Sequence, residues 1–372
     1  MYKLIILFGL FLSFQVIAQD HPEPVTLKPG AEAIDFKLKG VDGEMYSLAS
    51  FEDDRILVII YSAPHCPTAQ AYEDRIKAIQ NDYEDKGVQV VMINPNYPEA
   101  VCLEEMGYSD LGDSFEDMKI RAKDMDYNFP FLFDGETEET SIAYGPVATP
   151  HAYVFDENRI LRYVGRIDDS EKIGTATQHD LRNAIEALLA GEEVSVKQTK
   201  VFGCSIKWKW KDEWRKKLDK QWAEKEVSLE SLSVSDLKKL MKNKSENLRL
   251  INVWATWCGP CVAEFDELVD TYRMYMGRDF EMYTISTDNL SKKEKVKEFL
   301  AEKNAAVDGN YIFESDNRYD LIDNLDPEWQ GQIPYTVIVE PGGKIVYRHS
   351  GGLDFSELRK AIVEHPVIGR YF

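Results

Sequence analysis

Two cysteines separated by two residues, Cys258 and Cys261, carry the clearest chemistry in this chain. They follow the apolar run 248–257, which predicts that Cys258 stands at the first turn of a helix. Free backbone N–H groups and the helix dipole favour a thiolate there. The thiolate is the form that attacks disulfides, and C-x-x-C sites lower the thiol pKa from about 8.5 to as low as about 3.5. Cys258 is therefore predicted to attack and Cys261 to resolve, which is dithiol–disulfide exchange.

Two other uses of this cysteine pair are disfavoured by its surroundings. A structural zinc site needs a second pair of ligands, and none is suitably spaced in the sequence. Covalent attachment of haem would need a His directly after Cys261, where the chain has Val262. We therefore expect no metal and no cofactor, and we expect the pair to work as a redox-active Cys258–Cys261 disulfide.

Glu264 lies three residues after Cys261 on the same predicted helix. A carboxylate one turn away can exchange a proton with a thiol, and partial burial would raise its pKa so that it acts as a base near neutral pH. The alternative is a carboxylate on a solvated face of the helix. We predict that Glu264 assists proton transfer.

Cys66, in the first half of the chain, has a similar setting. Pro67 follows it, and proline suits the first turn of a helix because its missing N–H would have had no partner there. His65 beside the thiol could lower the pKa of Cys66, although an exposed His is mostly neutral at pH 7. We predict a reactive Cys66, and the alternative is a cysteine that only packs.

Cys102 and Cys204 bring the cysteines to five. An odd number leaves at least one free thiol or an intermolecular bond, and the sequence does not choose among the three single pairings of Cys66, Cys102 and Cys204. We expect Cys102 to be a free thiol on or near a long insertion, Asn94 to Met118.

The cysteine motifs stand in two copies of one plan. Each copy has an apolar strand, a cysteine, a helix, an X-Pro pair, a hairpin and a closing helix. In the first copy these are 56–61, Cys66, 71–83, Thr149-Pro150, 152–155 with 160–164, and 180–189. In the second they are 248–254, Cys258, 262–276, Ile333-Pro334, 336–339 with 344–348, and 355–364. This order predicts an α/β protein of two tandem domains, each a central mixed sheet flanked by helices.

The second copy resembles a known family. Its run from Asn252 to Cys261, N-V-W-A-T-W-C-G-P-C, is similar to the active-site strand and turn of exported thiol–disulfide oxidoreductases of the TlpA and ResA type, in the thioredoxin superfamily. The resemblance implies that Pro334 is cis. It also implies a set of residues that contact the substrate: Trp257, Gly259, Pro260, Ile333 and Pro334.

The first copy, from about Leu27 to Cys204, resembles redoxins of the AhpC/TSA-like group. The motifs that carry this resemblance are Pro29-Gly30, Pro64-His65-Cys66-Pro67, Thr149-Pro150-His151, Gly165-Arg166-Ile167-Asp168-Asp169 and Gly203-Cys204-Ser205-Ile206. The resemblance implies a cis Pro150, with Thr149 and Pro150 beside the substrate. Cys204 lies where a C-terminal resolving cysteine is expected, so we hypothesise a Cys66–Cys204 exchange pair.

The first copy departs from true peroxiredoxins at two positions. Those proteins have a P-x-x-x-[TS]-x-x-C frame, whereas here Ala63 holds the Thr/Ser position and Ile59 the Pro position. Ala69 stands where a second cysteine of a C-x-x-C pair would be. The departure counts against peroxidase activity.

The beginning of the chain predicts export. A short cationic start precedes an apolar run, Leu4 to Ile17, that is shorter than the about 20 residues a membrane-spanning helix needs. We predict a signal peptide over 1–18 and a mature protein that is soluble in the periplasm, with a retained membrane anchor as the alternative. The remaining predicted units are a redoxin domain over 22–205, a linker helix over 206–226 and a TlpA/ResA-like domain over 227–372.

The predicted linker is basic and aromatic, and Trp210 and Trp214 lie four residues apart, on one helix face. Such a helix can lie on a membrane surface, but we favour docking between the two halves because acidic residues interrupt the stretch. The net charge of −21 argues against nucleic-acid binding, which depends on basic residues at phosphates.

Together these features predict an exported thiol–disulfide oxidoreductase that reduces disulfides in client proteins and is fed by a membrane thiol donor. A flexible link between the halves would let Cys258 reduce a Cys66 disulfide of the same chain. Two alternatives stay open. One is a peroxide-reducing enzyme with a built-in reductase, and the other is an N-terminal half that serves as a client-binding module.

Overall fold

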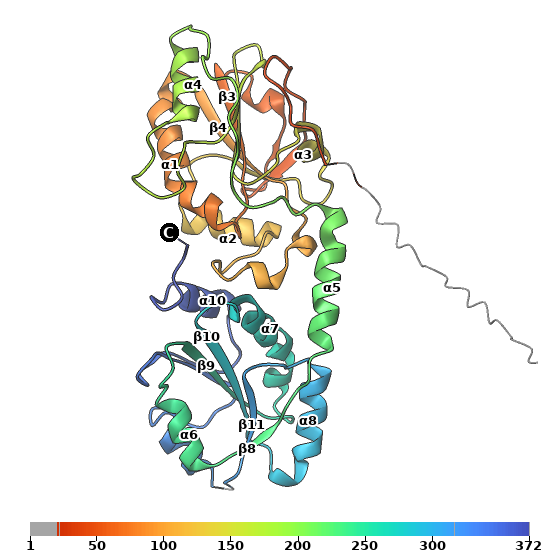
Figure 1. Cartoon of the computed structure of the whole chain (residues 1–372), viewed down its shortest axis with the longest axis vertical. Helices are drawn as coiled ribbons and strands as arrows, with labels where there is room; N and C mark the ends of the chain where they lie inside the picture. The colour runs from red at the N-terminus through yellow and green to blue at the C-terminus, as the bar shows by residue number, and fades with distance from the viewer. Residues whose placement is uncertain (1–20, 22, 316, 372) are drawn as a thin grey trace, which may run out of the picture.

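The computed structural model describes residues 21, 23–315 and 317–371. The predicted signal peptide therefore lies outside the described residues. The described chain forms two lobes, one above the other in Figure 1, each built around its own sheet. The predicted fold is confirmed: both sheets are mixed, and helices flank them.

The first sheet has seven strands in the order β2-β1-β5-β4-β3-β6-β7. Its strands are β1 (Leu38–Gly40), β2 (Met45–Tyr46), β3 (Ile56–Tyr61), β4 (Val88–Asn94), β5 (Phe131–Phe133), β6 (His151–Phe155) and β7 (Leu161–Gly165). Its helices are α1 (Pro67–Tyr83), α2 (Phe115–Asp124), α3 (Glu139–Tyr144) and α4 (Asp180–Leu189). The central strand β3 is buried along its whole length, parallel to β4 and antiparallel to β6.

Strand β3 shows why this apolar run forms the middle of the sheet. Successive side chains of a strand point to opposite faces, and here Val58 and Ile60 pack in the core beneath α1, whereas Leu57 and Ile59 pack in the core on the other face. Both faces are covered, so the strand is apolar throughout rather than alternating. Its end delivers the chain to Cys66.

The second sheet has six strands in the order β13-β12-β9-β10-β11-β8. Its strands are β8 (Glu230–Leu232), β9 (Leu248–Trp254), β10 (Phe280–Ser286), β11 (Gly309–Phe313), β12 (Tyr335–Val339) and β13 (Ile345–Ser350). Its helices are α6 (Val234–Met241), α7 (Gly259–Tyr275), α8 (Lys293–Glu302), α9 (Arg318–Leu325) and α10 (Phe355–Val363). Short 3₁₀ turns complete the chain: η1 (Leu48–Phe51), η2 (Glu84–Lys86), η3 (Pro98–Ala100), η4 (Leu103–Glu105), η5 (Lys209–Lys211) and η6 (Leu290–Lys292).

The two helices that follow the cysteines start beside the thiols, as predicted for Cys258 and Pro67, and so begin before the helical patterns of 71–83 and 262–276. Helix α1 starts at Pro67 rather than at residue 71, and α7 starts at Gly259 rather than at residue 262. In both cases the cysteine itself is the N-cap and a proline occupies the first turn, where its missing N–H costs no hydrogen bond. The thiols are therefore part of the helix ends.

A straight helix, α5 (Asp212–Ala223), connects the lobes (Figure 1). Docking is achieved by Trp222, whose Nε1 donates to the Asn304 carbonyl at 2.9 Å and whose ring packs near Tyr272. The expectation for Trp210 and Trp214 is wrong, because Trp210 lies in the preceding turn η5 and Trp214 is 53% exposed. The predicted linker helix is present as α5, so the connection is not the flexible link that reduction of Cys66 within one chain was expected to use.

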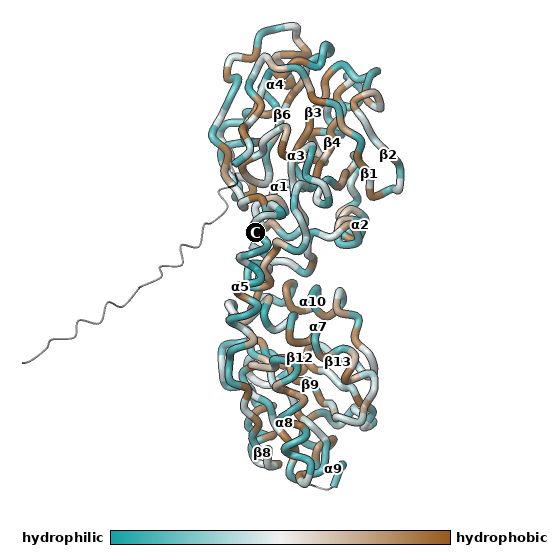
Figure 2. Tube along the Cα trace, turned by 90° about the vertical axis from the view of Figure 1, so that its right-hand side faces the viewer, coloured by the Kyte–Doolittle hydropathy of each residue, from teal (hydrophilic) through white to brown (hydrophobic). Residues whose placement is uncertain are grey.

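The insertion between β4 and α2 joins the lobes a second time. Val101 and Met106 are buried in the core of the second lobe, and Leu103 packs against it. The Arg273 guanidinium, 7% exposed, pairs with Glu104 at 2.9 Å and with Asp219 of α5 at 2.7 Å. Because apolar contacts and a shielded ion pair both cross the boundary, the structure holds the two lobes in contact (Figure 2).

Neither a membrane-spanning helix nor a metal-ligand cluster occurs among the described residues. In residues 21, 23–315 and 317–371, no helix combines the length and apolar character needed to cross a bilayer. Over the same residues, no three His, Cys, Asp or Glu side chains are grouped as metal ligands.

Candidate active site

The second lobe places Cys258 and Cys261 in a disulfide at the start of α7, with their Cα atoms 5.3 Å apart. Cys258 is the N-cap, and its Sγ accepts a hydrogen bond from the Cys261 N–H at 3.3 Å. Cys258 is 6% exposed and Cys261 is 1% exposed. The outer sulfur is thus the one that a partner can reach, and a backbone donor is ready to stabilise its thiolate.

The predicted substrate-contacting residues surround this disulfide. Trp257, Gly259 and Pro260 are exposed, with Trp257 at 58%. Strand β12 pairs antiparallel with β9, so that Tyr335 lies opposite Val253 and the cis Ile333–Pro334 bond reaches the same edge of the sheet as the cysteines. The exposed Trp257 side chain, next to Cys258 in the chain, offers an apolar surface to a polypeptide partner.

Glu264 is not on a solvated helix face. Its Oε2 accepts a hydrogen bond from the Leu353 N–H at 3.0 Å, and its Oε1 is buried without a hydrogen-bond partner among the described residues. Burial raises the pKa of Glu264 above its usual value, and the Leu353 hydrogen bond and the charge of His349 only partly oppose that shift. A carboxyl group with a raised pKa can hold and release a proton near neutral pH.

Asp288 organises the turn before Cys258, and it was not among the predicted site residues. Its carboxylate accepts hydrogen bonds from the Thr256 N–H and the Thr256 hydroxyl, both at 2.8 Å, and from the Ser286 hydroxyl at 2.9 Å. Asp288 lies just beyond β10, the neighbour of β9. The parallel pairing of β9 and β10 brings Asp288 to Thr256, and no local sequence motif indicates this contact.

The first lobe joins Cys66 to Cys204, the pairing hypothesised from the resemblance. Cys66 is the N-cap of α1, and its Sγ accepts from the Ala69 N–H at 3.3 Å. Cys66 is fully buried, whereas Cys204 is half-buried. The Cys66–Cys102 pairing is absent, because Cys102 is a buried free thiol. Burial raises the pKa of the Cys102 thiol to about 11, so it is a poor nucleophile at neutral pH.

Thr149 holds Cys204 against this helix. The two residues exchange backbone hydrogen bonds of 2.9 and 3.1 Å, and the Thr149–Pro150 bond that follows is cis. Gly203 is needed here, because a Cβ atom at that position would lie 2.0 Å from the Thr149 carbonyl oxygen. Both lobes therefore place an X-Pro segment beside their disulfide.

His65 is buried, not exposed as the sequence interpretation assumed, and it is bonded to Asp113. Its Nδ1 lies 2.6 Å from Asp113 Oδ2, and its backbone N–H donates to Oδ1 at 3.0 Å. The Asn96 amide donates to the same carboxylate at 2.6 Å. Burial alone would raise the pKa of Asp113, but the charge of His65 and these hydrogen bonds outweigh burial and hold that pKa below its usual value. Asp113 belongs to the insertion, and no motif around it in the sequence indicates its contact with His65.

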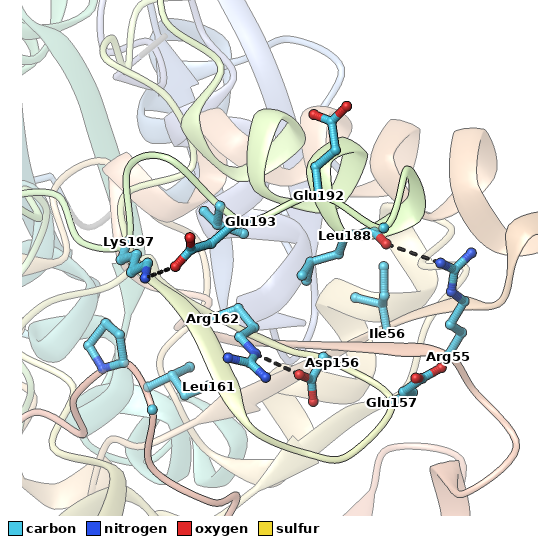
Figure 3. A pocket seen from close by; sticks show the side chains of 14 residues that line it. Arg55, Ile56, Asp156, Glu157, Leu161, Arg162, Leu188, Glu192, Glu193 and Lys197 are labelled. Atoms are coloured by element: carbon cyan, nitrogen blue, oxygen red, sulfur yellow. Dashed lines mark hydrogen bonds and ion pairs between the residues drawn. The ribbon is translucent and has the colours of Figure 1, made fainter.

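A hollow of about 460 Å³ lies elsewhere on the first lobe (Figure 3). It is lined by Arg55 and Ile56 at the beginning of β3, whereas Cys66 follows the end of that strand. Within it, Arg162 pairs with Asp156 at 2.6 Å, and Lys197 pairs with Glu193. The hollow is therefore separate from the thiol chemistry.

A cysteine at a helix start, a closing disulfide and a cis-proline segment on a mixed sheet, found twice, define the class of thioredoxin-like redox proteins. Comparison with known families places each half. Residues 29–164 match the AhpC/TSA family, and residues 219–362 match the Redoxin family. The chain thus belongs to the thioredoxin superfamily as two thioredoxin-like domains in tandem, an AhpC/TSA domain followed by a redoxin domain.

Individual relatives cover one part of the chain each. The thiol-disulfide oxidoreductase ResA of Oceanobacillus iheyensis is 28% identical over 109 residues, which are 29% of this chain and 52% of ResA. A Mycobacterium tuberculosis protein with the provisional name of a peroxiredoxin is 28% identical over 152 residues, 40% of this chain and 84% of that protein. An uncharacterized Geobacillus kaustophilus protein of solved structure is 36% identical, with 50% of this chain and 96% of that chain covered and a TM-score of 0.44. This chain spans about half the length of the two ResA proteins that it matches.

Proposed function

We propose that this protein is an exported thiol–disulfide oxidoreductase that reduces disulfides of client proteins through Cys258 and Cys261. The observation that carries the proposal is the Cys258–Cys261 disulfide at the N-terminus of α7, with the outer sulfur beside the exposed Trp257. The similarity to ResA proteins, which are named thiol-disulfide oxidoreductases, supports it. Release into the periplasm and a membrane thiol donor are part of the proposal.

The chemistry follows from the two sulfur environments. In the reduced protein the Cys258 thiolate attacks one sulfur of a client disulfide, forming a mixed disulfide and releasing the other client sulfur as a thiolate that takes up a proton. Cys261 then loses its proton to the Glu264 carboxylate and attacks Cys258. The client leaves as a dithiol. It has gained the two electrons that Cys258 and Cys261 lose when they form their disulfide.

The client is expected to be an extended polypeptide segment. Trp257 supplies an exposed apolar surface, and Pro334, directly before β12, has no backbone N–H to donate. Such a surface accepts many sequences, because backbone groups provide most of the contacts. We therefore propose disulfide-bearing proteins as a class of clients.

A disulfide-reduction assay tests the proposal. The full-length protein, charged with a dithiol, is expected to reduce insulin, and Cys258→Ala is expected to abolish that reduction. Cys66→Ser serves as the matched control, since it removes the other helix-capping cysteine and should retain activity. Equal rates for the wild-type protein and Cys258→Ala would rule the proposal out.

A second candidate function, peroxide reduction, is favoured by one observation in the first lobe. Cys66 sits at a helix N-terminus, paired with Cys204 and next to the bonded His65 and Asp113. Ala63 counts against this activity, as above. Consumption of hydrogen peroxide that is lost in Cys66→Ser would establish it. If client binding is lost on deleting the first lobe while Cys66→Ser has no effect, that lobe is a client-binding module instead.

A further inference from the structure

The two disulfides lie toward opposite ends of α7. Cys258 caps its N-terminal end, and Tyr275 is its last residue. With 17 residues in α7, the rise of an α-helix separates these ends by about 25 Å. The position of the first lobe relative to this helix therefore decides whether the disulfides can meet.

The first lobe is docked on the C-terminal end of α7, far from Cys258. The Tyr275 hydroxyl donates to the Ser109 carbonyl at 2.8 Å, and just beyond the helix the Arg278 Nη1 donates to the Gly107 carbonyl at 2.7 Å. Arg273, in the last turn, holds Glu104. All three acceptors belong to the insertion.

Helix α10 runs beside α7 in the same direction and docks at the same end. Its N-cap is Asp354. The preceding residue, Leu353, donates its N–H to Glu264, so α10 begins near the start of α7. Further along, Arg359 bonds Thr271, and Lys360 reaches Asp124 of the first lobe at 2.6 Å. The tail continues this contact, since Arg370 pairs with the buried Asp110 at 2.8 Å.

The same insertion borders the Cys66 disulfide. The Gln70 amide, in the first turn of α1, donates to Ser109 Oγ at 3.2 Å and to the Pro64 carbonyl at 2.8 Å. Asp113 holds the backbone of His65, directly before Cys66. The N-terminal disulfide is thus adjacent to the end of α7 that is remote from Cys258.

We infer that the Cys66–Cys204 disulfide receives electrons from a dithiol on a separate molecule and not from Cys258 of its own chain while the lobes are docked. Disulfide exchange requires sulfur atoms in contact, and the length of α7 keeps these sulfurs apart. The inference rests on the proposed function and deepens it, because it names the partner as an intermolecular C-x-x-C dithiol, such as that of a second copy of this chain.

Electron transfer to this disulfide takes two thiol–disulfide exchange steps. The incoming thiolate attacks Cys204, the more exposed sulfur, so a new intermolecular S–S bond forms and the Cys66–Cys204 bond breaks. Cys66 leaves as a thiolate that the Ala69 N–H stabilises and then takes up a proton. The second thiol of the donor loses its proton and closes the donor disulfide, and Cys204 departs and is protonated. The donor is oxidised by two electrons, and the pair in this lobe is reduced by the same two.

A dilution experiment tests the inference with full-length chains. The donor is the reduced double variant Cys66→Ser/Cys204→Ser, and the acceptor is the oxidised double variant Cys258→Ser/Cys261→Ser. Alkylation and mass spectrometry follow the appearance of free Cys66. We expect transfer in this mixture, and in the wild-type protein charged with one equivalent of dithiol we expect a tenfold dilution to slow transfer about tenfold, as for any second-order step.

Two outcomes would overturn the inference: transfer in the wild-type protein that is independent of dilution, or no transfer in the mixture. Insulin reduction by the donor chain is measured in parallel, so failure of the proposed function appears there and failure of this inference appears in the dilution series.

Loosening the docked surface provides a second measurement. Glu104→Arg with Asp110→Arg places like charges against Arg273 and Arg370, and it is expected to add a dilution-independent component to transfer. Glu105→Arg is the matched control, because Glu105 lies in the same turn η4 but pairs with Lys207. Small-angle X-ray scattering shows whether the lobes of the loosened variant separate. If they separate and transfer stays at the wild-type, dilution-dependent rate, the role of docking is contradicted.

Discussion

The two cysteine sites of this chain share a helix start but differ in how they close. Cys258 and Cys261 are three positions apart and both belong to α7, whereas Cys66 bonds to Cys204 across a separation of 138 residues. In the second lobe the helix-capping cysteine is the outer sulfur. In the first lobe the capping cysteine is the buried one. The same local motif thus presents opposite sulfurs to a partner, depending on where the second cysteine comes from.

The largest expected difference between the two sites is in disulfide reduction after removal of the outer sulfur of the second lobe. Cys258→Ala is expected to lower insulin reduction to the uncatalysed background, because no other described thiol combines a helix N-terminus with access from solvent. Cys204→Ser, which removes the more exposed sulfur of the first lobe, should leave that rate within about twofold, a free-energy difference of well under 1 kcal/mol. A comparable loss in both variants would show that the two sites work as one.

Stability should respond in the opposite order. A disulfide restricts the unfolded chain more when the loop it closes is long, and a loop of about 100 residues or more corresponds to about 4–5 kcal/mol. Cys204→Ser is therefore expected to lower the unfolding free energy of the first lobe by about that amount, measured by urea unfolding. Cys261→Ser, which opens a loop within one helical turn, is the control and should have the smaller effect.

The bonded His65 and Asp113 make the stability of the first lobe depend on pH in the acid range. Asp113→Asn is expected to cost about 3 kcal/mol at pH 7, because it leaves a buried His without its carboxylate. Since the pKa of Asp113 is lowered by folding, its contribution is present above the unfolded value of about 3.9 and is lost as pH falls through the folded value. The stability gap between wild type and Asp113→Asn should therefore shrink below about pH 4, as urea titrations would show; a gap that is constant with pH would contradict this.

Replacing Glu264 is expected to affect only one step at the second site, the resolving attack by Cys261. Glu264→Gln keeps an acceptor for the Leu353 N–H but cannot take a proton, so the resolving step by Cys261 is expected to slow by about a hundredfold at neutral pH. Because burial raises the pKa of Glu264, the wild-type rate should rise as the carboxyl ionises above its usual range, and the variant should lack that rise. Stopped-flow measurement of mixed-disulfide decay separates this step from the first attack, which should be unchanged.

Much of the fold could be predicted because the pattern repeats. The largely apolar strand before each cysteine, the later X-Pro pair and the closing helix all appear in the structure. The helical patterns of 71–83 and 262–276 begin three or four residues after the true helix starts, because the first turn of each helix holds the cap and proline rather than periodic apolar residues. Docking by Trp222 rather than by Trp210 and Trp214 was also missed, because which face of a linker helix is covered depends on its neighbours.

Features that depend only on neighbours within one helical turn, such as the redox-active turn of the second lobe, can be predicted from the sequence. The positions of Cys258, Cys261 and Pro260 are enough to form a redox-active turn, because strand, cap and resolving thiol are covalently close. The Cys66–Cys204 pair was hypothesised from a family resemblance, and the tertiary structure selects it among the three pairings. Only the tertiary structure shows that His65 meets Asp113 across 48 residues and that the first lobe covers the far end of α7. These contacts join segments that no local propensity links, and their free energy comes from burying surfaces that exist only after both lobes have folded.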